Sequence, residues 1–214
     1  MRTKNSKIQE AQGRINIYEM AQTSTTLLSS KSHKADITVT EGATFTVTGS
    51  EYKISTTSTS LSNLAQFDVI SVTGTTNNNK SFTIKSVADD GLSIIVEEVV
   101  TAETSDGSTD TVIDHVGFVT DKVKGDGYYS QPDGVHTVAY KIDTSVNASA
   151  TIKMQGSLAT TPTEDDFFDI GSTSPTPDQS TTIFSFNFTG NFVWVRAKIT
   201  GLTAGSITNI QLNN

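Results

Sequence analysis

A chain of 214 residues without cysteine cannot build a disulfide scaffold, a thiolate metal site or a catalytic thiol. Its hydrophobic share is 35% and its charged share 18%, and the polar remainder is carried mostly by Ser, Thr, Asn and Gly, which favours many short strands and turns over a helical bundle. The net charge of −8 is uneven: residues 1–34 hold six Lys or Arg against two Glu, so the remaining 180 residues carry −12. Such an acidic body would repel nucleic acid, and we expect no nucleic-acid partner.

Residues 1–34 are expected to form an extended N-terminal arm. They show a weak helical period but too few apolar side chains to make a domain, and they contain no signal-peptide core; nowhere do 18 apolar residues run together, so we expect no membrane contact. The arm is either a loosely attached terminus or a segment that becomes ordered on the acidic surface of a neighbouring subunit. In the second case the expected partner contacts are Arg2, Lys4, Lys7, Ile8, Arg14, Ile15 and Tyr18.

Residues 35–122 are expected to form a small all-β domain. Alternating runs predict strands over 37–40, 45–49, 52–56, 67–74, 80–87 and 92–98. Between them, residues 75–80 (TTNNNK) and the Asp89-Asp90-Gly91 turn are explicit hairpin signals. Strands repeating every 8 to 12 residues indicate a barrel or a sandwich, and we favour a barrel of five or six strands.

Residues 67–98, FDVISVTGTTNNNKSFTIKSVADDGLSIIVEE, carry a resemblance. The stretch resembles the small β-barrel module that recurs in structural proteins of tailed bacteriophages. The resemblance implies a barrel fold and a virion protein.

Residues 101–130 are rich in turn formers. Within them VIDHVGFVT, residues 112–120, is expected to be a strand that either completes the first domain or crosses to the second. A linker is placed at 123–133, and because it is short the two domains should touch.

Residues 134–214 are expected to form a second β domain, organised around the chain's last strands. Phe184, Phe186 and Phe188 share one face of a strand. After a turn at residues 189–191 comes a second alternating strand, so the two predict a hairpin with Phe186 and Val195 buried. A last strand at 207–212 is expected to close the edge of the sheet.

A second resemblance lies in residues 150–160 (ATIKMQGSLAT), 165–170 (DDFFDI) and 186–211. These segments resemble a C-terminal β-sandwich domain of virion structural proteins from marine phages, particularly those that infect cyanobacteria. The resemblance implies an antiparallel β-sandwich in a virion component.

We expect no catalytic, cofactor or metal site, and therefore no enzyme. The three histidines are isolated in sequence, and the Asp106-x-Ser108-x-Asp110 pattern is not followed by the glycine and the distal Glu that a calcium loop needs. The carboxylates at 164–169 have no second cluster to act with, and no nucleotide-binding or nucleophile motif occurs.

Phe192, Trp194 and Arg196 are expected to share one face of their strand, opposite the valines. That face is either covered by a loop, the other domain or another subunit, or it is an aromatic platform for a host glycan. The leading functional expectation is a phage virion structural protein, a capsid decoration protein that binds other virion proteins and forms a homo-oligomer. The alternatives are a neck, tail or fibre component, and a carbohydrate-binding module acting in host adsorption.

Overall fold

The computed structural model describes residues 24–105, 107–129, 134–147 and 149–213. The fold is all-β and the strand pairing is antiparallel throughout the described residues, as expected from composition and alternation. The strands are β1 (Ser24–Leu28), β2 (Lys31–Ser32), β3 (Ile37–Val39), β4 (Thr44–Thr48), β5 (Glu51–Ser55), β6 (Asp68–Thr73), β7 (Ser81–Val87), β8 (Ser93–Val96), β9 (Glu103–Thr104), β10 (Thr111–Val119), β11 (Val123–Lys124), β12 (Val135–Ile142), β13 (Thr151–Ser157), β14 (Phe168–Asp169), β15 (Ile183–Thr189), β16 (Trp194–Thr200) and β17 (Ser206–Asn213), with short 3-10 helices η1 (Asp126–Tyr129) and η2 (Glu164–Asp166).

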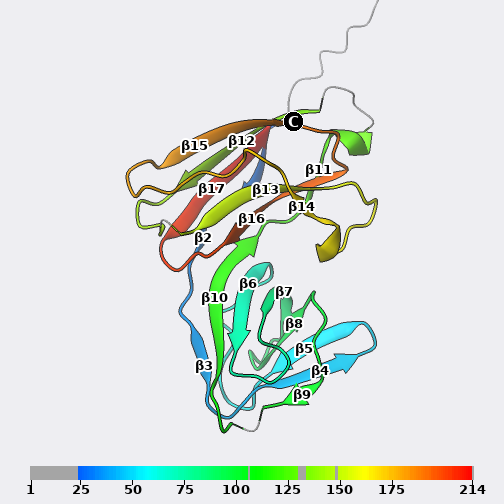
Figure 1. Ribbon diagram of the computed structural model, residues 1–214, viewed down its shortest axis with the longest axis vertical. Helices are drawn as coiled ribbons and strands as arrows, with labels where there is room; N and C mark the ends of the chain where they lie inside the picture. Colours follow the sequence, from blue (N-terminus) through cyan, green and yellow to red (C-terminus); the bar gives the residue numbers. More distant parts are fainter. Residues whose placement is uncertain (1–23, 106, 130–133, 148, 214) are drawn as a thin grey trace, which may run out of the picture.

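The strands form two sheets arranged in two lobes, one above the other in Figure 1. A five-stranded sheet has the order β1-β17-β12-β15, with β2 also paired to β17. A twelve-stranded sheet has the order β14-β13-β16-β10-β6-β7-β8-β5-β4-β9, with β11 on β16 and β3 on β10. We call β3 to β9 with the start of β10 the first lobe, and the rest the second lobe. In the described residues the strand path of the first lobe does not return on itself, so its sheet is open.

Each lobe has its own hydrophobic core. The first is built from fourteen buried residues of β3 to β10 and their loops, and the second from eighteen residues of both sheets. Strand β10 contributes to both, because Ile113 belongs to the first core and Phe118 to the second, and both are fully buried.

Strand β10 changes partners along its length. It pairs with β6 from Val112 to Phe118, whereas its other neighbour is β3 over its first three residues and β16 of the second lobe over its last two. The register against β6 shifts between His115 and Gly117. At Gly117 the backbone has φ +154°, and a Cβ atom there would lie 2.0 Å from the carbonyl oxygen of Ile199. The two lobes therefore meet backbone against backbone at a position where only glycine fits.

The expected N-terminal arm is shorter than residues 1–34. Strand β1 pairs with β17 over Ser24 to Leu28, and β2 pairs with β17 through Lys31 and Ser32. Leu27 and Leu28 pack against the second core, which explains why this segment joins the sheet. The expected linker at 123–133 likewise contains β11, which pairs with β16, and the helix η1.

The expected hairpin around Gly190 is wrong. Strand β15 pairs with β12 in the five-stranded sheet, whereas β16 pairs with β10, β11 and β13 in the other. The turn between them crosses from one sheet to the other, and the side chain of Phe192 enters the core at the crossing. Val195 is fully buried as expected, whereas Phe186 is only partly buried against the core, and Arg196 on the opposite face of β16 is buried as well.

The position expected for the last strand is also wrong. Strand β17 lies between β1 and β12 instead of at an edge. Its partner β1 comes from residues that the sequence analysis assigned to the arm, so a local pattern could not reveal it.

Replacing Ile199 with Ala should lower the free energy of unfolding by about 2–5 kcal/mol, because its fully buried side chain would leave a cavity in the second core. Chemical denaturation measures the loss. The same substitution at Ile183, which is 61% exposed, is the matched control and should change stability by less than about 0.5 kcal/mol. Equal losses at both positions would contradict the core described here.

Replacing Gly117 with Ala should destabilise the protein more than replacing Gly49 with Ala. Both glycines have positive φ, but a Cβ at Gly49 meets nothing within 4 Å, whereas one at Gly117 meets the Ile199 carbonyl. In both variants, alanine in a backbone conformation with positive φ is expected to cost about 1–3 kcal/mol. Only the variant at position 117 must also move β10 away from β16 to make room for the new Cβ atom. Thermal unfolding of the pair measures the difference, and equal midpoints would show that the close approach is unimportant.

Candidate functional site

The residues proposed as arm contacts lie outside the described part of the chain; these are Arg2, Lys4, Lys7, Ile8, Arg14, Ile15 and Tyr18. Two other cations of the same basic segment, Lys31 and Lys34, are placed, and both bind within the protein. Four cations and two glutamates remain in residues 1–23, so the charge that this segment can offer a partner is +2.

Lys31 and Lys34 surround a fully buried carboxylate, that of Asp68 at the start of β6. The Nζ atom of Lys31 lies 2.7 Å from Oδ1, and the Nζ atom of Lys34 lies 2.7 Å from Oδ2. The backbone N–H of Ala65 donates to Oδ2 at 2.8 Å. Because β2 belongs to the second lobe and β6 to the first, this cluster connects the lobes by charge as well as by backbone.

His115 completes the cluster from β10. The backbone N–H of Lys34 donates to its Nδ1 at 3.3 Å, so in the neutral ring the proton sits on Nε2, which faces Oδ1 of Asp68 at 3.6 Å. Burial opposes ionisation of Asp68, but His115, Lys31 and Lys34 together outweigh it and hold the pKa of this carboxyl well below its usual range. The ring of His33 lies 5.6 Å from that of His115. The arrangement is an inter-lobe ion cluster whose carboxylate and imidazole are both buried.

Phe192, Trp194 and Arg196 do not share an outer face. Phe192 is 8% exposed and lies in the second core, near Phe188 and His136. The ring of Trp194 is partly covered, because Tyr128 packs edge-on against it with the ring centroids 5.5 Å apart. The Nε1–H of Trp194 donates a hydrogen bond to the carbonyl of Thr160. The expectation of one continuous aromatic face fails because Phe192 precedes β16 and turns inward at the crossing between the sheets.

Arg196 is a buried structural cation. Its Nη1 and Nη2 atoms donate to the two carboxylate oxygens of Glu164 at 2.6 and 2.7 Å, and its Nε donates to Gln155 at 3.0 Å. The guanidinium also stacks on the ring of Phe167 at 3.8 Å. With all these groups engaged inside the protein, Arg196 holds η2 against the sheet, and this is the role of one of the carboxylates noted in the sequence at 164–169.

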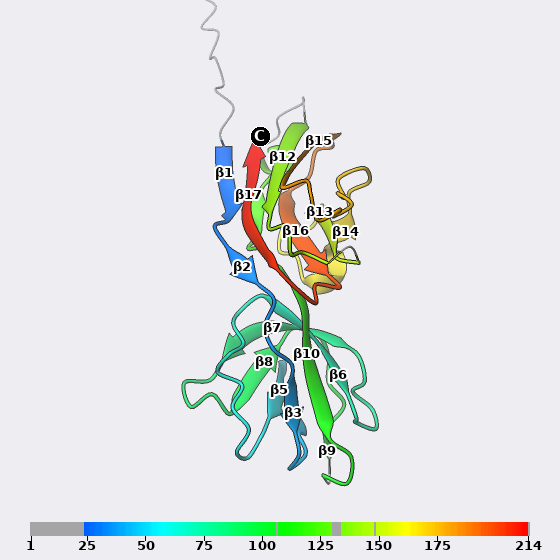
Figure 2. The ribbon, with the colours of Figure 1, turned by 90° about the vertical axis from the view of Figure 1, so that its left-hand side faces the viewer.

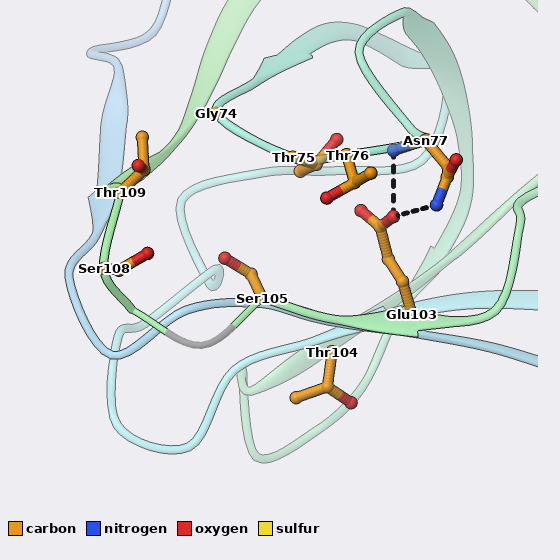
Figure 3. A pocket seen from close by; sticks show the side chains of 9 residues that line it. All are labelled: Gly74, Thr75, Thr76, Asn77, Glu103, Thr104, Ser105, Ser108 and Thr109. Atoms are coloured by element: carbon orange, nitrogen blue, oxygen red, sulfur yellow. Dashed lines mark hydrogen bonds between the residues drawn. The ribbon is translucent and has the colours of Figure 1, made fainter.

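A polar pocket with a volume of about 440 Å³, shown in Figure 3, lies at the far end of the first lobe. We call it the tip pocket, and it is lined by Gly74, Thr75, Thr76, Asn77, Glu103, Thr104, Ser105, Ser108 and Thr109. These residues come from the loop after β6 and from β9 with the loop that follows it. Both loops are rich in turn-forming residues, but no local pattern in the sequence indicates that they meet.

The two loops are held together by close backbone contact and by Glu103. A Cβ at Gly74, whose φ is +78°, would lie 2.0 Å from the carbonyl oxygen of Asp110. Oε2 of Glu103 accepts hydrogen bonds from the backbone N–H of Asn77 at 2.9 Å and from its Nδ2 at 2.8 Å (Figure 3). Oε1 is shielded from solvent and has no hydrogen-bond partner. Partial burial opposes ionisation, but the polar groups of Asn78 and Asn77 beside the carboxylate outweigh it and lower the pKa of Glu103.

Residues 24–105, 107–129, 134–147 and 149–213 contain no group of three or more His, Asp or Glu side chains that could hold a metal ion. Within the same ranges no helix is long and apolar enough to cross a membrane. Comparison of the chain with protein-family models, with curated proteins and with solved structures found no match.

Replacing Asp68 with Asn should cost about 3–5 kcal/mol at neutral pH, because it leaves the surrounding cations without their buried counter-charge. Since the folded pKa of Asp68 is depressed, its stabilisation is present above the ordinary Asp pKa of about 3.9 and is lost as the pH falls from there toward the folded pKa. The difference in unfolding free energy between wild type and variant should therefore narrow below pH about 4. Denaturant unfolding over a pH series measures it.

The exposed Asp165, replaced by Asn, provides the control for loss of one carboxylate. A constant difference between wild type and the Asp68 variant down to strongly acid pH would show that the charge of Asp68 is not what stabilises the junction.

Proposed function

We propose that this protein is a structural component of a bacteriophage virion, and specifically a capsid decoration protein. The sequence support is the resemblance of residues 67–98, 150–160, 165–170 and 186–211 to virion protein modules. In this proposal the first lobe is a small barrel-type module and the second lobe a sandwich module. The mechanism is preferential binding to the assembled shell, which stabilises it by mass action over many symmetric copies.

The observation that carries the proposal is the position of Ser24. It pairs with Asn213 at the end of the second lobe that lies farthest from the first (Figure 2). Residues 1–23, with their net charge of +2, are therefore attached at one end of the molecule, and the tip pocket lies at the other. A protein attached to a shell through its basic segment would hold the second lobe against the surface and the first lobe outward.

The distribution of exposed apolar side chains agrees with this orientation. In the described part of the chain, the large apolar side chains exposed on the second lobe are Tyr128, Val135, Leu158, Phe168 and Ile183. On the first lobe they are Val47 and Val99. Apolar surface concentrated on one lobe is typical of the part of a protein that contacts partners.

The test is deletion of residues 1–23 from the protein expressed during infection by the phage that encodes it. The deletion stops before β1, so every described strand remains. We expect the truncated protein to fold with an unchanged unfolding midpoint and to be strongly depleted from gradient-purified particles. The amount per particle is measured by quantitative mass spectrometry at two salt concentrations, since charge attraction weakens with salt.

A matched full-length variant separates charge from chain length. It carries Gln in place of Arg2, Lys4, Lys7 and Arg14, and it should attach more weakly than wild type but lose its dependence on salt. Recovery of full-length protein only outside the particles would overturn the virion assignment. Undiminished incorporation of the truncated protein would show that the body alone makes the attachment.

A further inference from the structure

Strand β15 is a long open edge of the five-stranded sheet. It pairs with β12 on one side and has no neighbour on the other among the described strands (Figure 1). The strand is seven residues long, and its register against β12 has no shift. At the opposite edge of the same sheet, β1 has five residues and an irregular register, and the edge strands β9 and β14 of the other sheet have two residues each.

The backbone groups of β15 alternate between those that bind β12 and those that point away from the sheet. The N–H of Ile142 donates to the carbonyl of Thr182, and the N–H of Gly190 donates to the carbonyl of Gly134. Both bonds fit the register of β12 with β15, so the even-numbered residues of β15 are the ones that exchange hydrogen bonds with β12. The odd-numbered residues of β15 therefore direct their N–H and C=O groups outward.

These outward groups are open to a second strand. Residues 171–182, which lead into β15, are held to β13 in the other sheet, where the hydroxyl of Thr173 accepts a hydrogen bond from the N–H of Met154. No hydrogen bond between described residues joins this segment to the backbone of residues 183–189. The four odd-numbered residues of β15 are all exposed.

The edge lacks the features that keep natural sheet edges from pairing. Such edges are blocked by charged side chains, by proline, by bulges or by shortness of the strand. The sequence of β15, IFSFNFT, contains no charged residue and no proline. Two copies of a chain of net charge −8 repel each other, but an uncharged strand adds nothing to that repulsion where they meet.

We propose that two copies of the chain pair through β15 across a two-fold axis at Phe186, the middle residue of the strand. Antiparallel pairing about this axis places Ser185 opposite Asn187 of the second copy, and Ile183 opposite Thr189 of the second copy. All four are odd-numbered residues, so each pair can exchange two hydrogen bonds and the whole strand is used. The pairing joins two five-stranded sheets into one.

The same register matches the side chains on both faces. On the inner face it sets Phe186 beside its symmetry mate and Phe184 beside Phe188 of the second copy, and aromatic pairs favour cross-strand contact. Phe184 and Phe186 are only partly buried within one chain. On the outer face Ile183, which is 61% exposed, enters the cross-strand row that contains Val135 of the second copy, which is 46% exposed.

A second copy fits this edge better than residues 1–23 of the same chain. Those residues leave the sheet at β1, on the opposite edge, and they carry four cations and two glutamates that have no counterpart in β15. Self-pairing supplies both the backbone groups and the matching side chains. It requires no other virion protein, so it does not depend on the proposed function.

The experiment is sedimentation equilibrium of the full-length chain at micromolar concentrations. The wild type is expected to reach twice the chain mass of 22.9 kDa. Ser185→Lys combined with Asn187→Lys should weaken pairing at least tenfold, because each new lysine faces a lysine of the second copy. Ser185→Lys combined with Asn187→Glu should pair about as tightly as the wild type, because opposite charges then face each other.

The double-lysine variant adds two positive charges to a chain of net −8, so its loss of pairing cannot come from stronger overall repulsion. Ser24→Lys combined with Thr26→Lys makes the same change at exposed residues of β1 and should pair like the wild type. Unfolding midpoints verify that every variant is folded. Amide hydrogen exchange measured by NMR should slow at Ser185 and Asn187 as the concentration of the wild type rises.

Four results would overturn the proposal. The first is a wild type that stays at the mass of one chain, and the second is a dimer that the double-lysine variant leaves intact. The third is equal loss of pairing in the Lys/Lys and Lys/Glu variants of β15, which would exclude the register about Phe186. The fourth is loss of pairing in the β1 variant alone. A dimer that behaves as expected but is absent from virions would contradict the proposed function and leave the pairing of β15 intact.

Discussion

One strand, β10, is the constraint on which the two-lobe structure depends. Its nine residues place Ile113 in one core and Phe118 in the other, so neither core can shift along the strand without disturbing its neighbour. The junction is reinforced by groups from separate parts of the chain. Asp68 lies opposite Phe118 on β6, and the lysines that neutralise it follow β1 in sequence. Backbone contact at Gly117 and the ion cluster therefore hold the same boundary.

This junction also explains the use of the basic segment near the N-terminus. A buried carboxylate requires partners, since an unpaired charge in the interior is strongly unfavourable. Lys31 and Lys34 supply them while their aliphatic parts cover apolar surface, and Lys31 lies over the ring of Phe118 at 5.2 Å. From the sequence, Lys31 and Lys34 belong to a basic segment that could bind a partner. In the structure both lysines instead stabilise the fold by pairing with Asp68.

Alternation in the sequence was sufficient to place most strands of the first lobe. It located β4 to β8 within one or two residues, because each is bounded by turn residues with a specific conformational preference.

Alternation failed where pairing joins distant segments. Strand β1 has no strong alternation of its own and is a strand because β17, at the other end of the chain, offers it hydrogen bonds. The turn at Gly190 suits a hairpin and a crossing between sheets equally well, and the deciding factor is the burial of Phe192. The tip pocket was beyond local reasoning for the same reason: each loop is an ordinary turn, and Gly74, tight against Asp110, is the one residue whose identity reflects their meeting.

The pairing of β1 with β17 has a consequence for how the chain is made. The strands β3 to β9 and the first half of β10 are contiguous, so the first lobe can complete its core while the ribosome is still translating the rest. The second lobe cannot, because β17, which lies between β1 and β12, is synthesised after the other described strands. Strands β1 and β2, which precede the first lobe in sequence, pair with β17 and so have no partner until then. During that interval a growing polypeptide presents a finished globule flanked on its N-terminal side by unpaired strands. Closure of the second lobe is thus a long-range, late event, slower than the local pairing that precedes it.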